Sequence, residues 1–217
     1  MEKIKMNIAV IAGQNPSPFC TALSAQFDYF VGVDRGALFL LQQSLPLNMA
    51  VGDFDSVSAA EFEGVLQQAE KLIRASTEKN DTDLELAISA IFHCYPQAKV
   101  QIFGALGGRL DHQMSNLFLV ANPEIAPFMS QIELIDSQNH ILFRPAGKHL
   151  LSPISQMNYI GFMPMQSGRL MIRYAKYPLN ETNYFIKPCY GSNEFIRDEI
   201  EIELESGYVL VIYSKDR

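Results

Sequence analysis

The sequence of 217 residues is poor in cysteine, in positive charge and in long hydrophobic runs. Its three cysteines (Cys20, Cys94 and Cys189) are odd in number and far apart, which argues against a disulfide framework and a structural zinc site. No apolar run approaches the roughly 20 residues that a membrane-spanning helix needs. The segment from Ile8 to Ala12 is also too short for a signal peptide. We therefore expect a cytoplasmic protein with no membrane partner.

The charge balance argues against nucleic acid as the main partner. Lys and Arg number 17 and Asp and Glu number 24, so the net charge is −7. Because phosphate backbones are bound largely through positive charge, an acidic chain is a poor generic binder of duplex nucleic acid. A basic pocket for one phosphorylated small molecule remains compatible with this charge. The apolar content of 48% is ordinary for a globular protein and argues against a disordered chain.

The first two thirds of the chain alternate short apolar runs with helical patterns. A capping box begins at Ser58, and another helical face is built from Leu84, Ala87, Ile88 and Ile91. This alternation predicts a mostly parallel sheet with helices on its faces, in a Rossmann-like α/β domain over residues 1–136. The predicted strands of this sheet cover residues 8–12, 29–33, 49–51, 71–75 and 100–103; a further strand over residues 133–136 lies where the pattern changes and flanks a turn with residues 141–143.

The pattern changes after about Ile132. Apolar runs become short, turn residues become frequent and helical periodicity disappears. Apolar and acidic residues alternate strictly over residues 200–204, and Ser206-Gly207 predicts a turn. Residues 208–213 are then predicted to form a second strand that runs back along the first. We therefore predict an antiparallel hairpin within a C-terminal antiparallel β-sandwich over residues 137–217.

Aspartates concentrate just after the predicted strands and at helix starts. Because the carboxyl ends of parallel strands form the edge where ligands bind, we expect these side chains to gather there. Clustered carboxylates repel by a few kcal/mol per close pair at an effective dielectric near 20, unless protons or a cation neutralise them. With no His or Cys nearby, the hard oxygen ligands favour Mg²⁺ or Mn²⁺. The six residues are Asp34, Asp53, Asp55, Asp81, Asp83 and Asp111.

Two short stretches provide the densest acidic pairs. In an extended segment Asp53 and Asp55 point to the same side, so both carboxylates reach one metal while Phe54 turns into the core. Ordinary turn and cap chemistry is the alternative explanation of this stretch. Asp81 and Asp83 open a helix, where the helix dipole favours acidic residues even without a function. In the functional interpretation, Asp83 coordinates the metal and the helix N-terminus binds phosphate.

The stretch from Gly107 to His112 follows a strand and precedes a helix. Paired glycines allow backbone N–H groups to approach an anion closely, and Arg109 can grip phosphate through two hydrogen bonds. Asp111 can orient or deprotonate a hydroxyl, or help to hold the metal. In the second part, Tyr177 beside Pro178 offers a flat platform for an aromatic ligand, although spacing alone favours a role in covering the core.

Together these stretches resemble the thiamine pyrophosphokinase family. The resemblance rests on GDFDS at 52–56, NDTDLELA at 80–87, GGRLDH at 107–112, KYPL at 176–179 and SNE at 192–194. It implies an α/β domain that binds ATP and metal, and a β-sandwich that binds thiamine and dimerises. The implied protein is a homodimer with its active site at the subunit interface. The implied reaction transfers the pyrophosphoryl group of ATP to the thiamine hydroxyl and releases AMP.

The resemblance also implies roles for individual residues. Asp53, Asp55 and Asp83 match the Mg²⁺ positions, with Mn²⁺ as the alternative ion, and Asp111 matches the carboxylate beside the reacting hydroxyl. Asn80 departs from the family, which often has Asp there, and Asn caps helices well. The implied ATP-binding residues are Asp34, Arg35, Ser56, Lys79, Thr82, Gly107, Gly108 and Arg109, and the implied thiamine-binding residues are His112, Tyr177, Pro178, Leu179, Ser192 and Asn193.

Two other functions are compatible with the same residues. Another Mg²⁺-dependent nucleotide phosphotransferase or hydrolase can use the same aspartates and turn over ATP without thiamine. A non-catalytic thiamine- or nucleotide-binding protein binds these ligands but forms no product.

Overall fold

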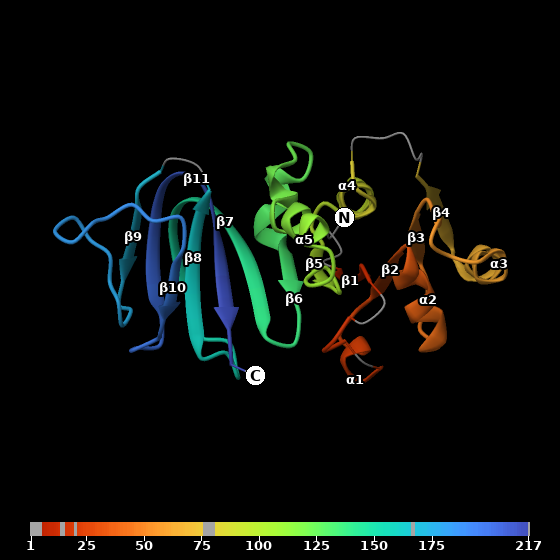
Figure 1. Ribbon diagram of the computed structural model, residues 1–217, viewed down its shortest axis with the longest axis horizontal. Helices are drawn as coiled ribbons and strands as arrows, with labels where there is room; N and C mark the ends of the chain where they lie inside the picture. Colours follow the sequence, from red (N-terminus) through yellow and green to blue (C-terminus); the bar gives the residue numbers. More distant parts are fainter. Residues whose placement is uncertain (1–5, 14–15, 20, 76–80, 166–167, 217) are drawn as a thin grey trace, which may run out of the picture. The chain divides into compact units, whose positions relative to one another are not determined.

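The computed structural model of the protein describes residues 6–13, 16–19, 21–75, 81–165 and 168–216. The chain forms two compact units, Met1–Ser137 and Gln138–Arg217. Figure 1 shows helices and strands alternating along the first unit, whereas the second unit consists of strands. Within the described ranges, no helix is long and apolar enough to cross a membrane.

The first unit contains a parallel sheet, as predicted. Every strand pair in it is parallel, and the order is β6-β5-β1-β2-β3-β4. Because the chain passes from β4 at one edge to β5 beside β1, the topological switch lies between β1 and β5. The strands are β1 (Asn7–Ile11), β2 (Tyr29–Val33), β3 (Met49–Gly52), β4 (Lys71–Arg74), β5 (Lys99–Phe103) and β6 (Ile132–Ile135).

The core of this unit lies on both faces of the sheet. Successive strand residues point to opposite faces. Ala9 and Ile11 of β1 belong to a cluster with Ala37 and Leu40, while Ile8 and its neighbours are equally inaccessible. Both faces are therefore covered, as is typical of parallel sheets. The helices are α1 (Thr21–Ser24), α2 (Arg35–Gln42), α3 (Ala59–Gln68), α4 (Asp83–Cys94) and α5 (Leu110–Leu117), with 3-10 turns η1 (Leu119–Ala121) and η2 (Ala126–Gln131).

Local sequence signals set the starts of two helices. The capping box predicted at Ser58 is present on α3, and Thr82 forms a second one with Glu85 on α4. The predicted apolar face of α4 is buried. The start of α5 has no such cap: its N-cap residue is Arg109, without a side-chain hydrogen bond, and none of its residues is buried.

The second unit is an antiparallel assembly of five strands with its own core. The order is β10-β8-β11-β7, and β9 pairs with β11. Phe162, Ile202 and Tyr213 are among the buried side chains that meet in this core. The strands are β7 (Asn139–Leu151), β8 (Tyr159–Met165), β9 (Leu170–Arg173), β10 (Tyr190–Asn193) and β11 (Ile200–Ser214).

The predicted hairpin over residues 200–213 was wrong. The segment is one strand, β11, which pairs with β7 on both sides of Ser206-Gly207. Leu204 pairs with Gly147 and Tyr208 with Pro145, so the register shifts at this point. Gly207 has a φ of 76°, so Ser206-Gly207 forms a bulge within the strand instead of a turn between two strands. The bulge separates the half of β11 that pairs with β9 from the half that pairs with β8.

Candidate active site

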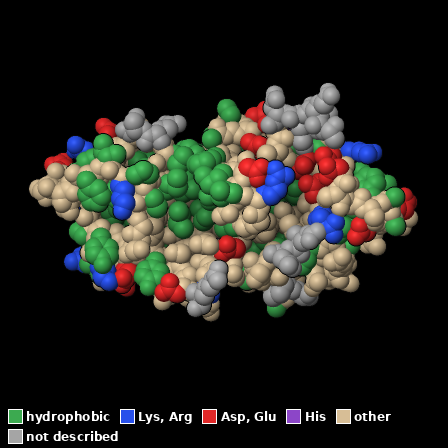
Figure 2. Space-filling view, viewed as in Figure 1, with side chains coloured by type: hydrophobic (Ala, Val, Ile, Leu, Met, Phe, Trp, Pro, Cys, Tyr) green, Lys and Arg blue, Asp and Glu red, His purple; other side chains and the backbone are tan. Residues whose placement is uncertain are grey.

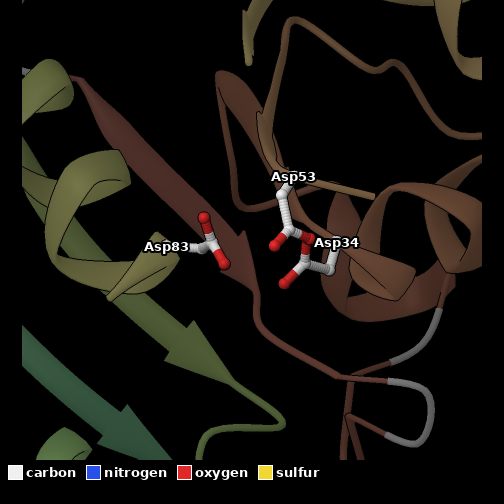
Figure 3. A group of neighbouring side chains, drawn as sticks. All are labelled: Asp34, Asp53 and Asp83. Atoms are coloured by element: carbon white, nitrogen blue, oxygen red, sulfur yellow. The ribbon is translucent and has the colours of Figure 1, made fainter. Parts of the chain in front are cut away.

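Three aspartates converge at the carboxyl ends of the parallel strands. Asp34 follows β2, Asp53 follows β3, and Asp83 is the first residue of α4. Figure 3 shows their carboxylates pointing toward one another, and one oxygen from each lies within 4.8 Å of the others. We call this group the acidic trio. It confirms that carboxylates from distant stretches of the chain meet at this edge of the sheet.

Backbone hydrogen bonds and a helix cap fix the backbone of Asp34 and Asp83. The N–H of Asp34 donates to the carbonyl of Val51 at 2.9 Å, which ties the end of β2 to β3. Asp83 is held at the helix start by the capping box, in which the Thr82 N–H donates to Glu85 at 2.8 Å. The hydroxyl of Thr82, implied to bind phosphate, accepts from the Glu85 N–H at 3.2 Å.

Asp34 is electrostatically the most perturbed member of the acidic trio. Burial and the negative charges of Asp83 and Asp53 raise its pKa to about 7, against the opposing effect of a hydrogen bond from the Phe54 N–H. Its Oδ1 atom is buried and has no hydrogen-bond partner within the described part of the chain. A buried, unpartnered oxygen beside two further carboxylates fits a hard divalent cation such as Mg²⁺ or Mn²⁺.

The membership of the acidic trio differs from the prediction in one position. Asp55 is exposed and does not belong to the group, while Asp34 does. The prediction assumed an extended segment, but Phe54 has a φ of 59° and the chain turns there. The ring of Phe54 is buried, as predicted, and the Asp55 N–H donates to Asp53 Oδ1 at 3.0 Å. The turn therefore leaves the Asp55 carboxylate outside the acidic trio.

A cleft of about 290 Å³ opens over the acidic trio. We call it the acidic cleft. It lies beyond the ends of β1, β2 and β3, next to the topological switch where ligands bind in open α/β sheets. Its wall includes His112, which the family resemblance assigned to thiamine, and Asp81, one of the six aspartates expected at this edge. It also includes Ser115 and Asn116, which received no ligand role. Other residues lining the cleft are Ala12, Val33, Asp34, Asp53, Thr82, Asp83 and Leu84.

Arg109 and Asp111 pair with each other. The guanidinium donates to both carboxylate oxygens, at 3.1 Å from Nε and 2.5 Å from Nη2. This hydrogen bonding lowers the pKa of Asp111 to about 2, so the carboxylate is ionised at neutral pH. Both side chains are largely exposed. Figure 2 shows acidic side chains gathered on the surface of the first unit, with basic side chains beside them.

The other implied ATP-binding residues lie at the start of α2, in loops, or outside the described residues. Arg35, the first residue of α2, donates to the carbonyl of Ser56 at 2.8 Å, which links this helix to the loop after β3. Gly107 and Gly108 are exposed and have φ values of 91° and 75°. Lys79 and Asn80 lie outside the described residues.

The second unit contains a separate pocket of about 310 Å³, which we call the aromatic pocket. Tyr177, Pro178, Leu179 and Asn193, all implied to bind thiamine, line it, whereas Ser192 is exposed beside it and is not part of the wall. The remaining wall is formed by Ile172, Phe185, Lys187, Tyr190 and Gly191.

Asn193 positions Tyr177 rather than presenting a free amide. Its Oδ1 accepts from the Tyr177 N–H at 2.9 Å and its Nδ2 donates to the Tyr177 carbonyl at 2.8 Å. Asn193 is only 2% exposed, while Tyr177 is 57% exposed. The buried amide thus fixes the backbone from which an accessible ring projects.

Comparison with known proteins assigns the chain to a family. Residues 20–132 match the family model described as "Thiamin pyrophosphokinase, catalytic domain", and residues 148–209 match "Thiamin pyrophosphokinase, vitamin B1 binding domain". The chain belongs to the thiamin pyrophosphokinase family. It is 32% identical over 214 residues to thiamine pyrophosphokinase of Bacillus subtilis (strain 168), an alignment that covers 96% of this chain and 99% of the relative.

Solved structures of the thiamin pyrophosphokinase family share the fold. A family member from Enterococcus faecalis is 39% identical, with a TM-score of 0.90 over 97% of this chain and 100% of that one. The thiamine pyrophosphokinase of Bacillus subtilis is 29% identical, with a TM-score of 0.79 over 97% and 100% of the two chains. Apart from Ala12, the residues that line the acidic cleft lie within the segment that matches the catalytic model, and those of the aromatic pocket lie within the segment that matches the vitamin B1 binding model.

Sequence reasoning missed several residues that line the aromatic pocket. Phe185, Lys187 and Tyr190 lie in or next to the loop before β10, which carries no periodic pattern. The Tyr190 hydroxyl donates to the Phe185 carbonyl at 2.7 Å and accepts from the Lys187 N–H at 3.1 Å. The aromatic residues of this loop were the one feature of the sequence that could have indicated a pocket wall.

Proposed function

We propose that the chain transfers the pyrophosphoryl group of ATP to the hydroxyl of thiamine, giving thiamine diphosphate and AMP. The observation that carries this proposal is the convergence of the acidic trio in a cleft within the segment that matches the catalytic model. The match of the remaining chain to the vitamin B1 binding model supports thiamine as the acceptor. We assign ATP and metal to the first unit and thiamine to the second.

The acidic trio is the proposed metal site. Asp34, Asp53 and Asp83 would hold Mg²⁺, with Mn²⁺ as the alternative, and ATP is the co-substrate. When bound, the ion neutralises phosphate charge, which is the main requirement of phosphoryl-type transfers. The first turn of α4 adds backbone N–H groups that favour an anion beside the trio.

Arg109 and Asp111 have complementary roles in the proposed reaction. Arg109 turns from Asp111 to the phosphates, where its planar guanidinium stabilises the charge of the transferred group. The released Asp111 carboxylate orients the thiamine hydroxyl and accepts its proton. The hydroxyl oxygen bonds to the β-phosphorus, and the bond from that phosphorus to the oxygen bridging the α-phosphate breaks, so AMP leaves.

The aromatic pocket is the proposed thiamine site. The accessible ring of Tyr177 stacks on the ligand, Pro178 and Leu179 form an apolar wall, and Asn193 holds Tyr177 in place. We also propose that the second unit is a β-sandwich and that the protein acts in the cytoplasm as a homodimer with its active site at the subunit interface. Exposed apolar side chains of this unit, Phe185, Ile186 and Ile196, support association with a second copy.

The test is incubation of the full chain with ATP, Mg²⁺ and thiamine, followed by mass detection of the products. We expect thiamine diphosphate and AMP in equal amounts, and neither product when thiamine or Mg²⁺ is left out. Nucleotide turnover that does not depend on thiamine would instead identify a different phosphotransferase or hydrolase. Binding of thiamine and ATP by calorimetry without any product would identify a non-catalytic binding protein.

A further inference from the structure

Gly52 occupies an unusual place beside the acidic trio. It is the last residue of β3, it is buried, and its φ is 153°. A Cβ atom built on Gly52 would lie 1.9 Å from Asp34 Oδ1 and 2.9 Å from Asp34 Cγ. These separations are far below van der Waals contact, so any side chain at position 52 and the observed Asp34 carboxylate exclude each other.

We propose that Gly52 is a positioning residue for the Asp34 carboxylate. The missing side chain at position 52 creates the recess in which this carboxylate lies, and the recess directs it toward Asp53 and Asp83. The proposal deepens the proposed function, because it rests on the acidic trio being the metal site of that reaction.

The recess at Gly52 and a hydrogen bond from the Phe54 N–H together set the direction of the Asp34 carboxylate. The Asp34 backbone cannot withdraw easily, because its N–H donates to Val51 at 2.9 Å. The Oδ1 atom has no hydrogen bond within the described residues that would hold it in place. A side chain at position 52 would therefore rotate the Asp34 carboxylate out of the acidic trio.

Glycines elsewhere in the chain provide a matched control. Gly147 also has a positive φ, of 126°, but a Cβ there would meet only His149 Nε2, at 4.0 Å. Alanine at Gly147 therefore imposes comparable backbone strain without displacing a carboxylate. Gly107 and Gly108 have nothing within 4 Å of an added Cβ, so their positive φ values alone require glycine.

The experiment measures Mn²⁺ binding to the metal-free full chain by electron paramagnetic resonance of the free ion, without nucleotide. We expect Gly52→Ala to weaken Mn²⁺ binding at least tenfold and Gly147→Ala to leave it unchanged. In an Asp34→Ala background the two closest contacts of the added Cβ are removed and the next is the Asp34 backbone N, at 3.3 Å, so Gly52→Ala should then cause no further loss. Equal weakening in both backgrounds, or wild-type affinity of Gly52→Ala, would overturn the proposal.

Thermal unfolding of the wild-type chain, Gly52→Ala, Asp34→Ala and the double variant provides a second measurement in case Gly52→Ala does not fold. Removal of the Asp34 carboxylate relieves the clash, so the double variant should then recover a cooperative transition. Failure of the double variant to fold when Asp34→Ala alone folds would refute a role through Asp34. Wild-type chain that binds Mn²⁺ at the acidic trio but forms no thiamine diphosphate would contradict the proposed function and leave the role of Gly52 intact.

Discussion

Replacement of Asp34 by Asn should stabilise the metal-free protein. At pH 8 the Asp34 carboxylate, with a pKa of about 7, is ionised beside two further carboxylates. Two unit charges 4.8 Å apart repel by about 3.5 kcal/mol at an effective dielectric near 20. Because the acidic cleft admits solvent and counterions, we discount this value and expect a net gain of about 1–2 kcal/mol. For a chain of this size that gain raises Tm by roughly 2–8 °C.

The pH dependence of this difference follows from the sign of the pKa shift. Because the folded protein raises the pKa of Asp34, the stability contributed by its protonated form is complete below the ordinary carboxyl pKa, near 4. This contribution is lost as the pH rises to about 7. The advantage of Asp34→Asn should therefore shrink as the pH is lowered from 8 and disappear near pH 4.

Thermal unfolding with and without Mg²⁺ measures both effects. We expect Mg²⁺ to raise the Tm of the wild-type chain and to leave that of Asp34→Asn almost unchanged, because the variant lacks one metal ligand. Asp55→Asn is the control for the metal-free measurement, since Asp55 is exposed and outside the acidic trio. The reasoning fails if Asp34→Asn lowers the metal-free Tm at pH 8. It also fails if Asp55→Asn, rather than Asp34→Asn, loses the response to Mg²⁺.

Three further predictions concern caps, pocket walls and charge pairs. Thr82→Ala removes a capping box and should cost about 1 kcal/mol in chemical denaturation, whereas Thr82→Ser should not. Asn193→Ala leaves the partly buried backbone N–H and carbonyl of Tyr177 without their partner, so we expect the free energy of unfolding to fall by about 1 kcal/mol. The same variant should have a higher KM for thiamine and an unchanged KM for ATP, and the reverse pattern would contradict the assigned role. Arg109→Ala frees Asp111, so the pKa of that carboxylate should rise toward its ordinary value in an NMR titration, while an unchanged pKa would show that the ion pair is absent in solution.

Local sequence patterns predicted much of the first unit. Each predicted strand of the parallel sheet is present, because short apolar runs bounded by turn residues identify buried strands without reference to distant residues. The caps at Ser58 and Thr82 depend on contacts three residues apart, which a sequence displays directly. The family motifs contain Asp53 and Asp83 of the acidic trio, whereas Asp34 lies outside all of them.

Tertiary structure decided which of these residues meet. Asp34 rather than Asp55 completes the acidic trio, because Phe54 adopts a left-handed backbone conformation while its ring packs in the core against Phe62. Ser206-Gly207 forms a bulge rather than a turn because β7 pairs with the chain on both sides of it. Burial and strand register depend on partners far away in the sequence, and the spacing of residues along one segment does not identify those partners.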